Sequence, residues 1–482
     1  MRLLSILRNK VVFYLSTRYL TYALQFLTSL VIAAKLGPFY FGVWGFILLL
    51  LQYFQQCHFG IYNSFNVLYV QYREDETRCK SYIANSILLE SYLALLVIVV
   101  FCIYFICGDN YFEKYNADKY FIWVCVIAIL QYFQGLIINI FRVKNLLNYV
   151  SICQSAIVVF NFLCIFFFNG ETLIRMLLAG YIFGNVLAIV LAWASGILRV
   201  QGSIISKVYQ IEILKKGLYL FLYNTCFYFI IISIRTIIST NYKVEEFGQF
   251  TFSFSLAYAV MLLLESLTFI VFPKVIGKLS SCNNDVVFMT IHEYRTIYQT
   301  SAHGLIYFAL CFFPLLISFF PKYDVALTSM NLVALTVLMD TSRSGYAELL
   351  VARNKERQLA IVTIMALILN CILSLIEVKI FNVKFSYVIL ASLVTYYFLA
   401  IAIVIKGRKE TENSVNILSV IVDVFPMRLL IPYLCALFLA VCEIYNIIFL
   451  PLLLFLIMNY KESKYLLTLS KRILLNPKIV NL

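Results

Sequence analysis

Residues 83–106 read IANSILLESYLALLVIVVFCIYFI, and Glu90 is the single charged side chain in that stretch. The hydrocarbon core of a bilayer is crossed by about 20 apolar residues in a helix. Because backbone polar groups in lipid must bond internally, only helices and closed barrels cross it, and barrel strands read as short alternating segments. The stretch therefore predicts a membrane-spanning α-helix.

Apolar runs of this kind fill most of the chain, which has 482 residues, 63% of them hydrophobic and 13% charged, and a mean hydropathy of +0.90. This composition is typical of an all-α integral membrane protein. We predict fourteen spans, with twelve spans and a re-entrant hairpin as the alternative, because the last two runs are short. The spans lie near 12–34, 40–62, 83–106, 120–141, 150–168, 175–197, 217–239, 248–272, 297–320, 326–349, 359–378, 385–405, 428–442 and 444–460.

The polar gaps between the runs alternate between basic and weakly charged segments, which predicts an orientation. The gaps on one side, together with both termini, hold 26 of the 38 Lys and Arg residues, and the opposite gaps hold seven. Basic residues stay on the cytoplasmic side of membrane proteins, so both termini are expected in the cytoplasm. The net charge of +14 is explained by this membrane face rather than by nucleic-acid binding.

Two sequence matches at nearly constant spacing indicate an internal repeat. Phe41-Gly42 and Phe247-Gly248 are 206 residues apart, and Lys144-Asn145 and Arg353-Asn354 are 209 apart. Six spans separate the copies, so we expect two parallel six-helix bundles related by a pseudo-twofold axis along the membrane normal. The predicted divisions are the N-terminal bundle at 1–197, a cytoplasmic linker at 198–216, the C-terminal bundle at 217–405, and an extra C-terminal hairpin with a basic tail at 406–482.

Two stretches near the N-terminus carry a family resemblance. Residues 34–46 read AKLGPFYFGVWGF, and residues 52–66 contain the sequence FGIYNS at 59–64. The first stretch resembles the polysaccharide flippases of the multidrug/oligosaccharidyl-lipid/polysaccharide exporter superfamily, and the second resembles their O-antigen type. The second half departs from this pattern, because Lys243-Val-Glu-Glu246 stands where a Gly-Pro turn is expected.

The resemblance implies a bacterial inner-membrane protein with two six-helix bundles and an additional C-terminal helix pair. It implies that the substrate is an undecaprenyl-pyrophosphate-linked oligosaccharide, the O-antigen repeat unit. Alternating access would move this substrate from the cytoplasmic to the periplasmic leaflet, with an ion gradient as the expected driving force. Membrane lipids and other polysaccharide-assembly proteins are the expected partners.

Charged side chains inside predicted spans mark functional candidates, because they are costly in a bilayer. Guanidinium groups bind phosphate oxygens through paired hydrogen bonds and stay charged. We therefore predict that Arg18, Arg235 and Arg343 contact the pyrophosphate. An interior salt bridge is the structural alternative for each, and it is favoured for Arg235, which lies about one turn from the outer end of its span.

Three acidic residues are candidates for ion coupling. Asp340 precedes Arg343 by three residues, so the two can pair on one helix face. Protonation of Asp340 would release Arg343 to the pyrophosphate, whereas an inert ion pair explains the spacing equally well. Glu265 and Glu90 are the other candidates for carrying a proton or cation, with a salt bridge between helices as the alternative.

The pentapeptide Leu-Gln-Tyr-Phe-Gln occurs twice, at 51–55 and 130–134. In each copy the two glutamines fall on one helix face, Gln52 with Gln55 and Gln131 with Gln134. We predict that these amides contact sugar hydroxyls. Hydrogen bonding between helices is the alternative, and it is the more usual role of amides in membranes.

No enzymatic chemistry is predicted. The thirteen cysteines form no CxxC pair and the three histidines are scattered, so neither a metal site nor a cofactor is expected. The largest outer gap, 107–119, is too short for a catalytic domain, and the sequence has no phosphate-binding glycine-rich motif. The alternatives are a multidrug exporter of the same superfamily and a polysaccharide polymerase or glycosyltransferase of the inner membrane.

Overall fold

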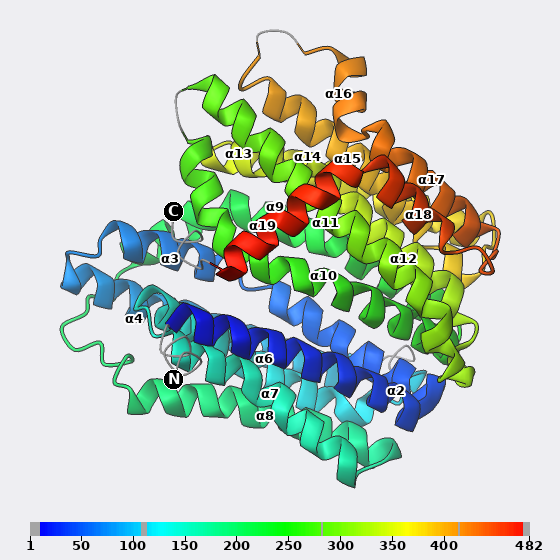
Figure 1. Ribbon diagram of the computed structural model, residues 1–482. Helices are drawn as coiled ribbons and strands as arrows, with labels where there is room; N and C mark the ends of the chain where they lie inside the picture. Colours follow the sequence, from blue (N-terminus) through cyan, green and yellow to red (C-terminus); the bar gives the residue numbers. More distant parts are fainter. Residues whose placement is uncertain (1–9, 108–112, 281–282, 413–414, 476–482) are drawn as a thin grey trace. The chain divides into compact units, whose positions relative to one another are not determined.

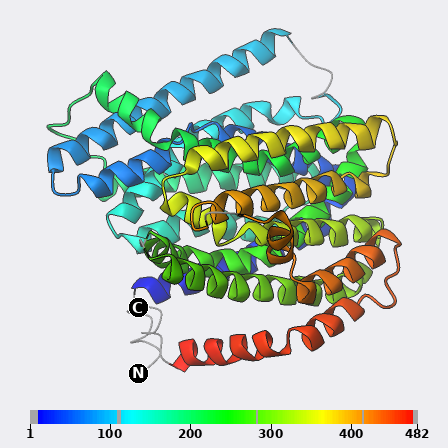
Figure 2. The same cartoon turned by 90° about the horizontal axis from the view of Figure 1, so that it is seen from above.

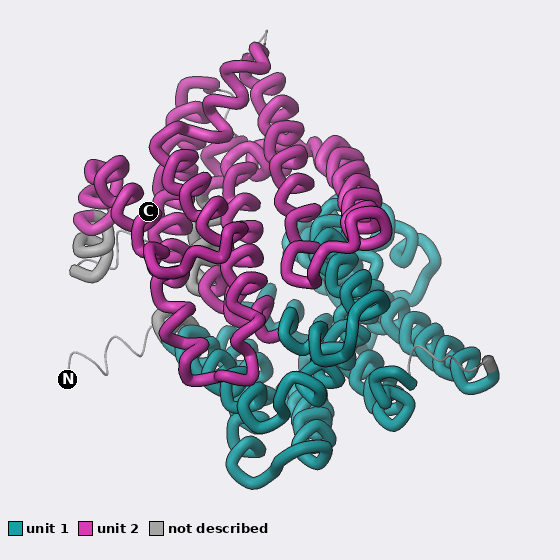
Figure 3. The backbone as a smooth tube through the Cα atoms, turned by 90° about the vertical axis from the view of Figure 1, so that its right-hand side faces the viewer, with its two compact units in different colours: residues 1–251 teal, residues 252–482 magenta. Residues whose placement is uncertain are grey.

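The computed structural model describes residues 10–107, 113–280, 283–412 and 415–475, and the side chains of 10–15, 263–274 and 469–475 lie outside the described part. The described residues form helices and connecting turns, without a β-strand among them (Figure 1). They group into two compact units, residues 1–251 and 252–482, drawn in separate colours in Figure 3. The predicted all-α membrane fold class is confirmed.

Unit 1 is a bundle of long apolar helices. It contains α2 (Lys10–Gln56), α3 (Ile61–Gln71), α4 (Glu76–Cys107), α6 (Asp118–Val143), α7 (Leu147–Phe167), α8 (Gly170–Ala194), α9 (Lys207–Asn241) and the first turns of α10 (Val244–Leu279). The longest helix, α2, holds the first two predicted spans. It is divided at Gly37, which has a left-handed φ of 67° and precedes Pro38. After this break the chain turns back on itself (Figure 1).

The second part of α2 runs antiparallel to α9. Gly45 and Gln52 contact Arg235 near the end of α9, whereas Gly60, just after α2, lies against Gly217 near its beginning. Gly45 also permits a close approach to α10, since a Cβ there would be 2.5 Å from the Thr251 hydroxyl. Thus α9 and the first turns of α10 pack with the first six spans, although the repeat assigns them to the second half of the chain.

Unit 2 contains more interrupted helices than unit 1. It comprises the rest of α10, α11 (Asn284–Ser318), η1 (Pro321–Tyr323), α12 (Ala326–Asp340), η2 (Thr341–Arg343), α13 (Tyr346–Ala352), α14 (Glu356–Lys379), η3 (Phe385–Tyr387), α15 (Leu390–Arg408), α16 (Ile417–Val424), α17 (Met427–Val441), α18 (Leu450–Met458) and α19 (Tyr460–Leu475). The C-terminal helices α18 and α19 follow one another along an edge of this unit and pack on α11 (Figure 2).

Within the described residues, nine helices are long and apolar enough to cross a membrane, and α16 with α17, bent by 65°, make a tenth if they form one span. The structure corrects three predicted continuous spans. The span at 326–349 breaks after Asp340, where Gly345 adopts a φ of 84°. The span at 40–62 ends at Gln56, before the left-handed Gly60, and the span at 444–460 contains only the nine-residue α18. The total of fourteen spans stays a prediction.

The internal repeat is visible in local geometry. Asn145 and Asn354 both have left-handed φ angles, 58° and 54°, directly after α6 and α13. The hydrogen bonds around them match: the residue after each asparagine donates to a carbonyl five residues earlier, Leu146 to Phe141 and Lys355 to Leu350. This pattern is a helix C-cap in which asparagine replaces the usual glycine. The second sequence match is therefore also a structural match.

Candidate functional site

Arg235 of α9 is almost fully buried in unit 1, with 2% of its surface exposed. Its Nη1 donates to Gln52 Oε1 at 2.6 Å and its Nη2 donates to the Gly45 carbonyl oxygen at 3.0 Å. The guanidinium also lies over the Phe247 ring, 5.9 Å from its centroid. The alternative to substrate binding was an interior salt bridge. These contacts agree with it in that the partners belong to the protein, but the partners are neutral groups rather than a carboxylate. A role in substrate binding stays a prediction and requires these bonds to open.

Arg18 lies on the first part of α2 and is half-buried. Its Nη1 donates to Gln154 Oε1 of α7 at 2.8 Å, and its guanidinium lies 4.7 Å from the centroid of the Tyr22 ring. A guanidinium has five N–H donors, and the neutral amide of Gln154 accepts only one of them in this contact. Gln154 orients Arg18 without neutralising its positive charge, which suits a residue that is predicted to meet an anion.

Asp340 and Arg343 form an ion pair at the break between α12 and α13. Arg343 Nε donates to Asp340 Oδ1 at 2.5 Å and Nη2 donates to Oδ2 at 3.3 Å. The predicted pairing is present, but the expected continuous helix is wrong, because α12 ends at Asp340 and Arg343 belongs to the 3₁₀ turn η2. In a 3₁₀ turn the side chains at i and i+3 eclipse each other, which brings the two charges together. The side chains are 25% and 17% exposed, so the pair is only partly buried.

The glutamine pair of α6 and the Asp340–Arg343 pair at the junction of α12 and η2 occupy equivalent positions in the repeat. Gln131 and Gln134 precede the Asn145 cap by the same number of residues as Asp340 and Arg343 precede the Asn354 cap, an offset of 209. One copy therefore carries two neutral amides where the other carries a carboxylate and a guanidinium. The first copy keeps a continuous helix, whereas the second is broken at the charged pair.

The four glutamines differ in their surroundings. Gln52 binds Arg235, and Gln55, one turn later on α2, is exposed. Gln134 is half-buried on α6, and the buried Gln131 Oε1 has no hydrogen-bond partner among the described residues. For Gln52 the structure shows a contact between helices, which is the alternative interpretation. Sugar binding by the other three stays a prediction.

Arg295 of α11, which the sequence analysis placed in a cytoplasmic loop, is a buried centre of unit 2, with 5% of its surface exposed. Its Nη1 donates to the carbonyl oxygens of Ser342 at 3.0 Å and Ser344 at 3.1 Å, and its Nη2 donates to that of Asp423 at 2.9 Å. One guanidinium thus holds the α12–α13 break and the end of α16 together. Glycine suits position 345 because its φ is 84°, and a Cβ there would also be 3.0 Å from the Arg295 side chain.

The Asp423 carboxylate extends this network. It accepts a hydrogen bond from the Tyr346 hydroxyl at 2.8 Å and forms a 3.1 Å ion pair with Arg408 Nη2. Arg408 Nη1 also donates to the Ser419 hydroxyl at 2.7 Å. The network therefore joins α11, α13, α15 and α16, and it fixes both helix breaks of unit 2 in one arrangement.

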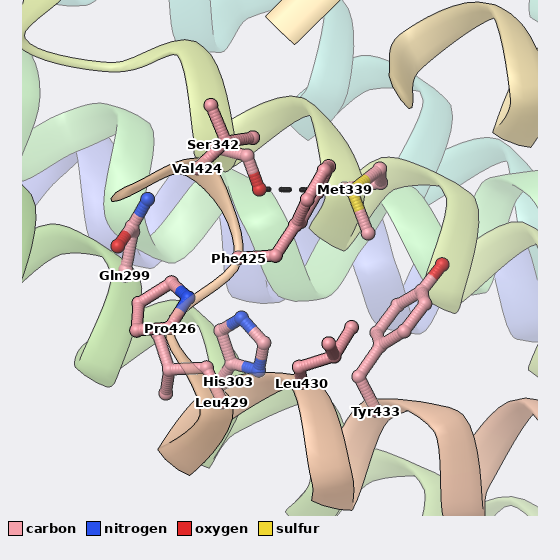
Figure 4. A pocket seen from close by; sticks show the side chains of 10 residues that line it. All are labelled: Gln299, His303, Met339, Ser342, Val424, Phe425, Pro426, Leu429, Leu430 and Tyr433. Atoms are coloured by element: carbon pink, nitrogen blue, oxygen red, sulfur yellow. Dashed lines mark hydrogen bonds between the residues drawn. The ribbon is translucent and has the colours of Figure 1, made fainter. Parts of the chain in front are cut away.

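A small pocket lies where the two breaks meet (Figure 4). Gln299 and His303 of α11 border it with Ser342 of η2, and these side chains are 4%, 6% and 6% exposed. The rest of the lining is largely apolar and comes from α12 and the α16–α17 region: Met339, Val424, Phe425, Pro426, Leu429, Leu430 and Tyr433. Broken helices supply binding sites in transporters, but this space is smaller than that of a typical drug-sized ligand.

A signal in the sequence could have revealed Arg295. The predicted span began at residue 297, whereas α11 begins at Asn284. The buried side chains Val287, Ile291, Tyr294 and Arg295 recur at helical spacing through the segment that was counted as a loop. This periodicity places Arg295 on the apolar face of a helix, where an arginine requires partners.

The remaining predicted residues are acidic. Glu90 of α4 is fully buried in unit 1. Glu265 falls among residues 263–274, whose side chains lie outside the described part. Across the described residues, no three His, Cys, Asp or Glu side chains are grouped as a metal site would require.

Comparison with known proteins identifies the family. The family described as "Polysaccharide biosynthesis protein" matches residues 7–276, more than half of the chain. The chain belongs to this polysaccharide biosynthesis family. No curated protein sequence matches it.

Solved structures show which fold this family member adopts. The chain is similar to the lipid II flippase MurJ in an inward closed conformation, with a TM-score of 0.69 at 13% identity, over 94% of this chain and 98% of that one. It is also similar to an inward-facing multidrug resistance MATE family transporter of the MOP superfamily, with a TM-score of 0.66 at 11% identity, over 81% and 94%. At these identities the likeness shows the fold alone, and it agrees with the predicted all-α membrane fold class.

Proposed function

We propose that this polysaccharide biosynthesis protein is a flippase for an undecaprenyl-pyrophosphate-linked oligosaccharide, the O-antigen type of repeat unit. It would work by alternating access from the cytoplasmic to the periplasmic leaflet of a bacterial inner membrane, with both termini in the cytoplasm. The family match over residues 7–276 carries the proposal, because it links the chain to polysaccharide assembly. The fold shared with a lipid II flippase supports it. No bond in the substrate is made or broken, so the activity is transport rather than catalysis.

The positions of two arginines fit this substrate. Arg18 is held by a neutral amide, and Arg343 pairs with the Asp340 carboxylate at a helix break. Guanidinium groups match the oxygens of a pyrophosphate through paired hydrogen bonds and stay charged. Protonation of Asp340 would remove its charge and free Arg343, which provides one route for ion coupling. Gln55, Gln131 and Gln134 are the proposed contacts for sugar hydroxyls.

A multidrug exporter is the second candidate, because MATE transporters share the fold. Such an exporter for cationic drugs would be expected to use acidic binding groups, whereas Arg18 and Arg343 are basic. A polymerase or glycosyltransferase is the third candidate. It would require a reactive site outside the bundle, and the described outer connections, such as 380–389 and 442–449, are short.

Deleting the gene and complementing it tests the proposal. The leaflet distribution of lipid-linked saccharide and the amount of surface polysaccharide are followed together. We expect repeat units to be stranded on the cytoplasmic leaflet and surface polysaccharide to be lost, with the wild-type gene restoring both. Unpolymerised repeat units on the periplasmic leaflet would instead identify a polymerase. Unchanged polysaccharide with increased drug sensitivity would identify a multidrug exporter.

A further inference from the structure

Glu90 interrupts the apolar stretch of α4, and none of its surface is exposed. Neither carboxyl oxygen has a hydrogen-bond partner among the described residues. Ser86, one turn earlier on the same face of α4, is also fully buried, and its hydroxyl likewise has no partner in the described part of the chain. Native proteins contain few such atoms, and each requires an explanation.

The groups around Glu90 are aromatic and neutral. Helices α3, α6 and α9 pack against α4. Tyr62 of α3 and Tyr132 of α6 are close enough to interact electrostatically with Glu90. The Tyr62 hydroxyl donates to the Tyr132 carbonyl oxygen at 2.9 Å, so it is already committed to a protein acceptor. His58 stacks on Tyr62 with 4.5 Å between the ring centroids, and the Cys57 thiol lies near Tyr132.

The charged side chains of α9 do not provide a counter-ion for the Glu90 carboxylate. Lys215, Lys216 and Tyr219 are exposed to the surroundings of the bundle. Glu212 accepts a hydrogen bond from Tyr82, which lies about two turns before Glu90 on α4. No ion pair involves Glu90 in the described part of the chain, where the ion pairs of α4 are at its beginning, as in Glu76 with Lys80.

An ionised carboxylate in these surroundings would lack both a donor and a counter-ion, which is costly, whereas the neutral acid avoids that cost. A metal ion would need several oxygen ligands, and the described residues hold no group of three His, Cys, Asp or Glu side chains around Glu90. We propose that Glu90 is a proton-binding site of unit 1 that exchanges its proton past Tyr62 and His58 when the helices rearrange, and thereby couples proton flow to transport. The proton-binding site is argued from residues of unit 1 alone, whereas the coupling to transport depends on the proposed flippase function.

Carbodiimide labelling of the full-length protein in vesicles tests the binding site without any substrate. Dicyclohexylcarbodiimide modifies protonated carboxyls in apolar surroundings, and the adduct is located by peptide mass spectrometry. We expect labelling of Glu90 that disappears as the pH is raised, and no labelling of Glu76, an exposed carboxylate on the same helix. Absence of a Glu90 adduct in the folded protein would overturn the proposal. Protection by Na⁺ at constant pH would overturn it as well, by showing a cation site.

Transport of lipid-linked saccharide by Glu90→Gln, with Glu76→Gln as the matched control, tests the coupling. The amide mimics the protonated acid, so we expect Glu90→Gln to insert normally and to lose the acceleration caused by an imposed proton gradient. A variant that keeps this acceleration would show that Glu90 is a permanently neutral structural acid, and would overturn the coupling. If labelling succeeds and gene deletion leaves the lipid-linked saccharide correctly distributed, the proton site stands while the proposed substrate fails.

Discussion

Gly248 lies so close to Pro38 that a Cβ on Gly248 would sit 1.9 Å from the Pro38 carbonyl oxygen. The reciprocal contact exists, because a Cβ on Gly42 would sit 2.2 Å from the carbonyl oxygen of Val244. Gly42 and Val244 correspond to Gly248 and Pro38 at the repeat offset of 206 residues. The repeated Phe-Gly dipeptides are therefore a symmetrical helix crossing, and glycine is needed in both copies for backbones to touch.

Replacing either glycine of this crossing by alanine should separate the second part of α2 from α10. We expect Gly42→Ala and Gly248→Ala each to destabilise the protein by about 1–3 kcal/mol, the usual cost of overpacking. Thermal unfolding in detergent measures the effect. Gly277→Ala is the matched control on α10, since its Cβ would meet nothing within 4 Å, and it should be neutral or slightly stabilising. Equal effects at positions 248 and 277 would contradict the crossing.

Much of the fold could be predicted from the sequence. Continuous apolar runs such as 83–106 leave a helix as the only structure that satisfies the backbone in lipid, so fold class follows from composition and length. The Lys144-Asn145 and Arg353-Asn354 match was predicted as part of an internal repeat, and in the structure it lies at two equivalent helix caps. The break at Gly345 was missed, since an apolar run reads the same whether its helix is straight or interrupted. Helix α16 was missed because Ile417–Val424 lies in the gap between the predicted spans 385–405 and 428–442.

The candidate site was harder to predict, because partners distant in the sequence determine what a charged residue does. The spacing of Asp340 and Arg343 was sufficient to predict their pairing, a local property. By contrast, the Arg235 contact with Gln52 spans 183 residues, and the Arg295 contacts with the carbonyl oxygens of two helix breaks depend on tertiary packing. The sequence can therefore identify a charged residue inside a span, but it does not show whether the substrate or the protein supplies its hydrogen-bond partners.

Removing the Arg295 guanidinium should be among the most destabilising changes in unit 2. Arg295→Met leaves the carbonyl oxygens of Ser342, Ser344 and Asp423 without this donor, and we expect a loss of about 3 kcal/mol or more. Arg175→Met is the control, because the Arg175 pair with Glu171 is exposed at the surface of α8 and should contribute little to stability. Similar unfolding temperatures for the two variants would show that the helix breaks are held by other contacts.

Neutralising Arg343 should affect transport more than stability. Its pair with Asp340 is partly exposed, so we expect Arg343→Gln to cost about 1 kcal/mol or less. If Arg343 contacts the pyrophosphate, export of lipid-linked saccharide should fall more than tenfold, the equivalent of about 1.4 kcal/mol. Complementation of a deletion strain, scored at equal membrane abundance, measures this loss. Arg78→Gln is the control, because Arg78 forms an exposed ion pair with Asp75. Equal export by the two variants would contradict a contact between Arg343 and the substrate.

Lys114, in the connection before α6, caps the end of α9. Its Nζ donates to the carbonyl oxygens of Ser239 at 2.8 Å and Tyr242 at 2.6 Å, where a positive charge also complements the helix dipole. We expect Lys114→Met to destabilise the protein by about 1–2 kcal/mol near neutral pH. The exposed Lys119, a few residues later, gives the control Lys119→Met, for which a change below about 0.5 kcal/mol is expected.

Lys114 should also contribute to the pH dependence of the free energy of unfolding. Burial lowers the pKa of the Lys114 ammonium from its ordinary value, and nearby Glu246 opposes part of this shift. Between the lowered folded pKa and the ordinary unfolded pKa, the unfolded chain binds more protons than the folded one, so this lysine makes the free energy of unfolding rise with pH. The free energy of unfolding is measured at several pH values through the alkaline range. The rise with pH should be present in the wild type and in Lys119→Met, and it should be lost in Lys114→Met. If the wild type and Lys114→Met keep the same slope, Lys114 is not buried at this cap in solution.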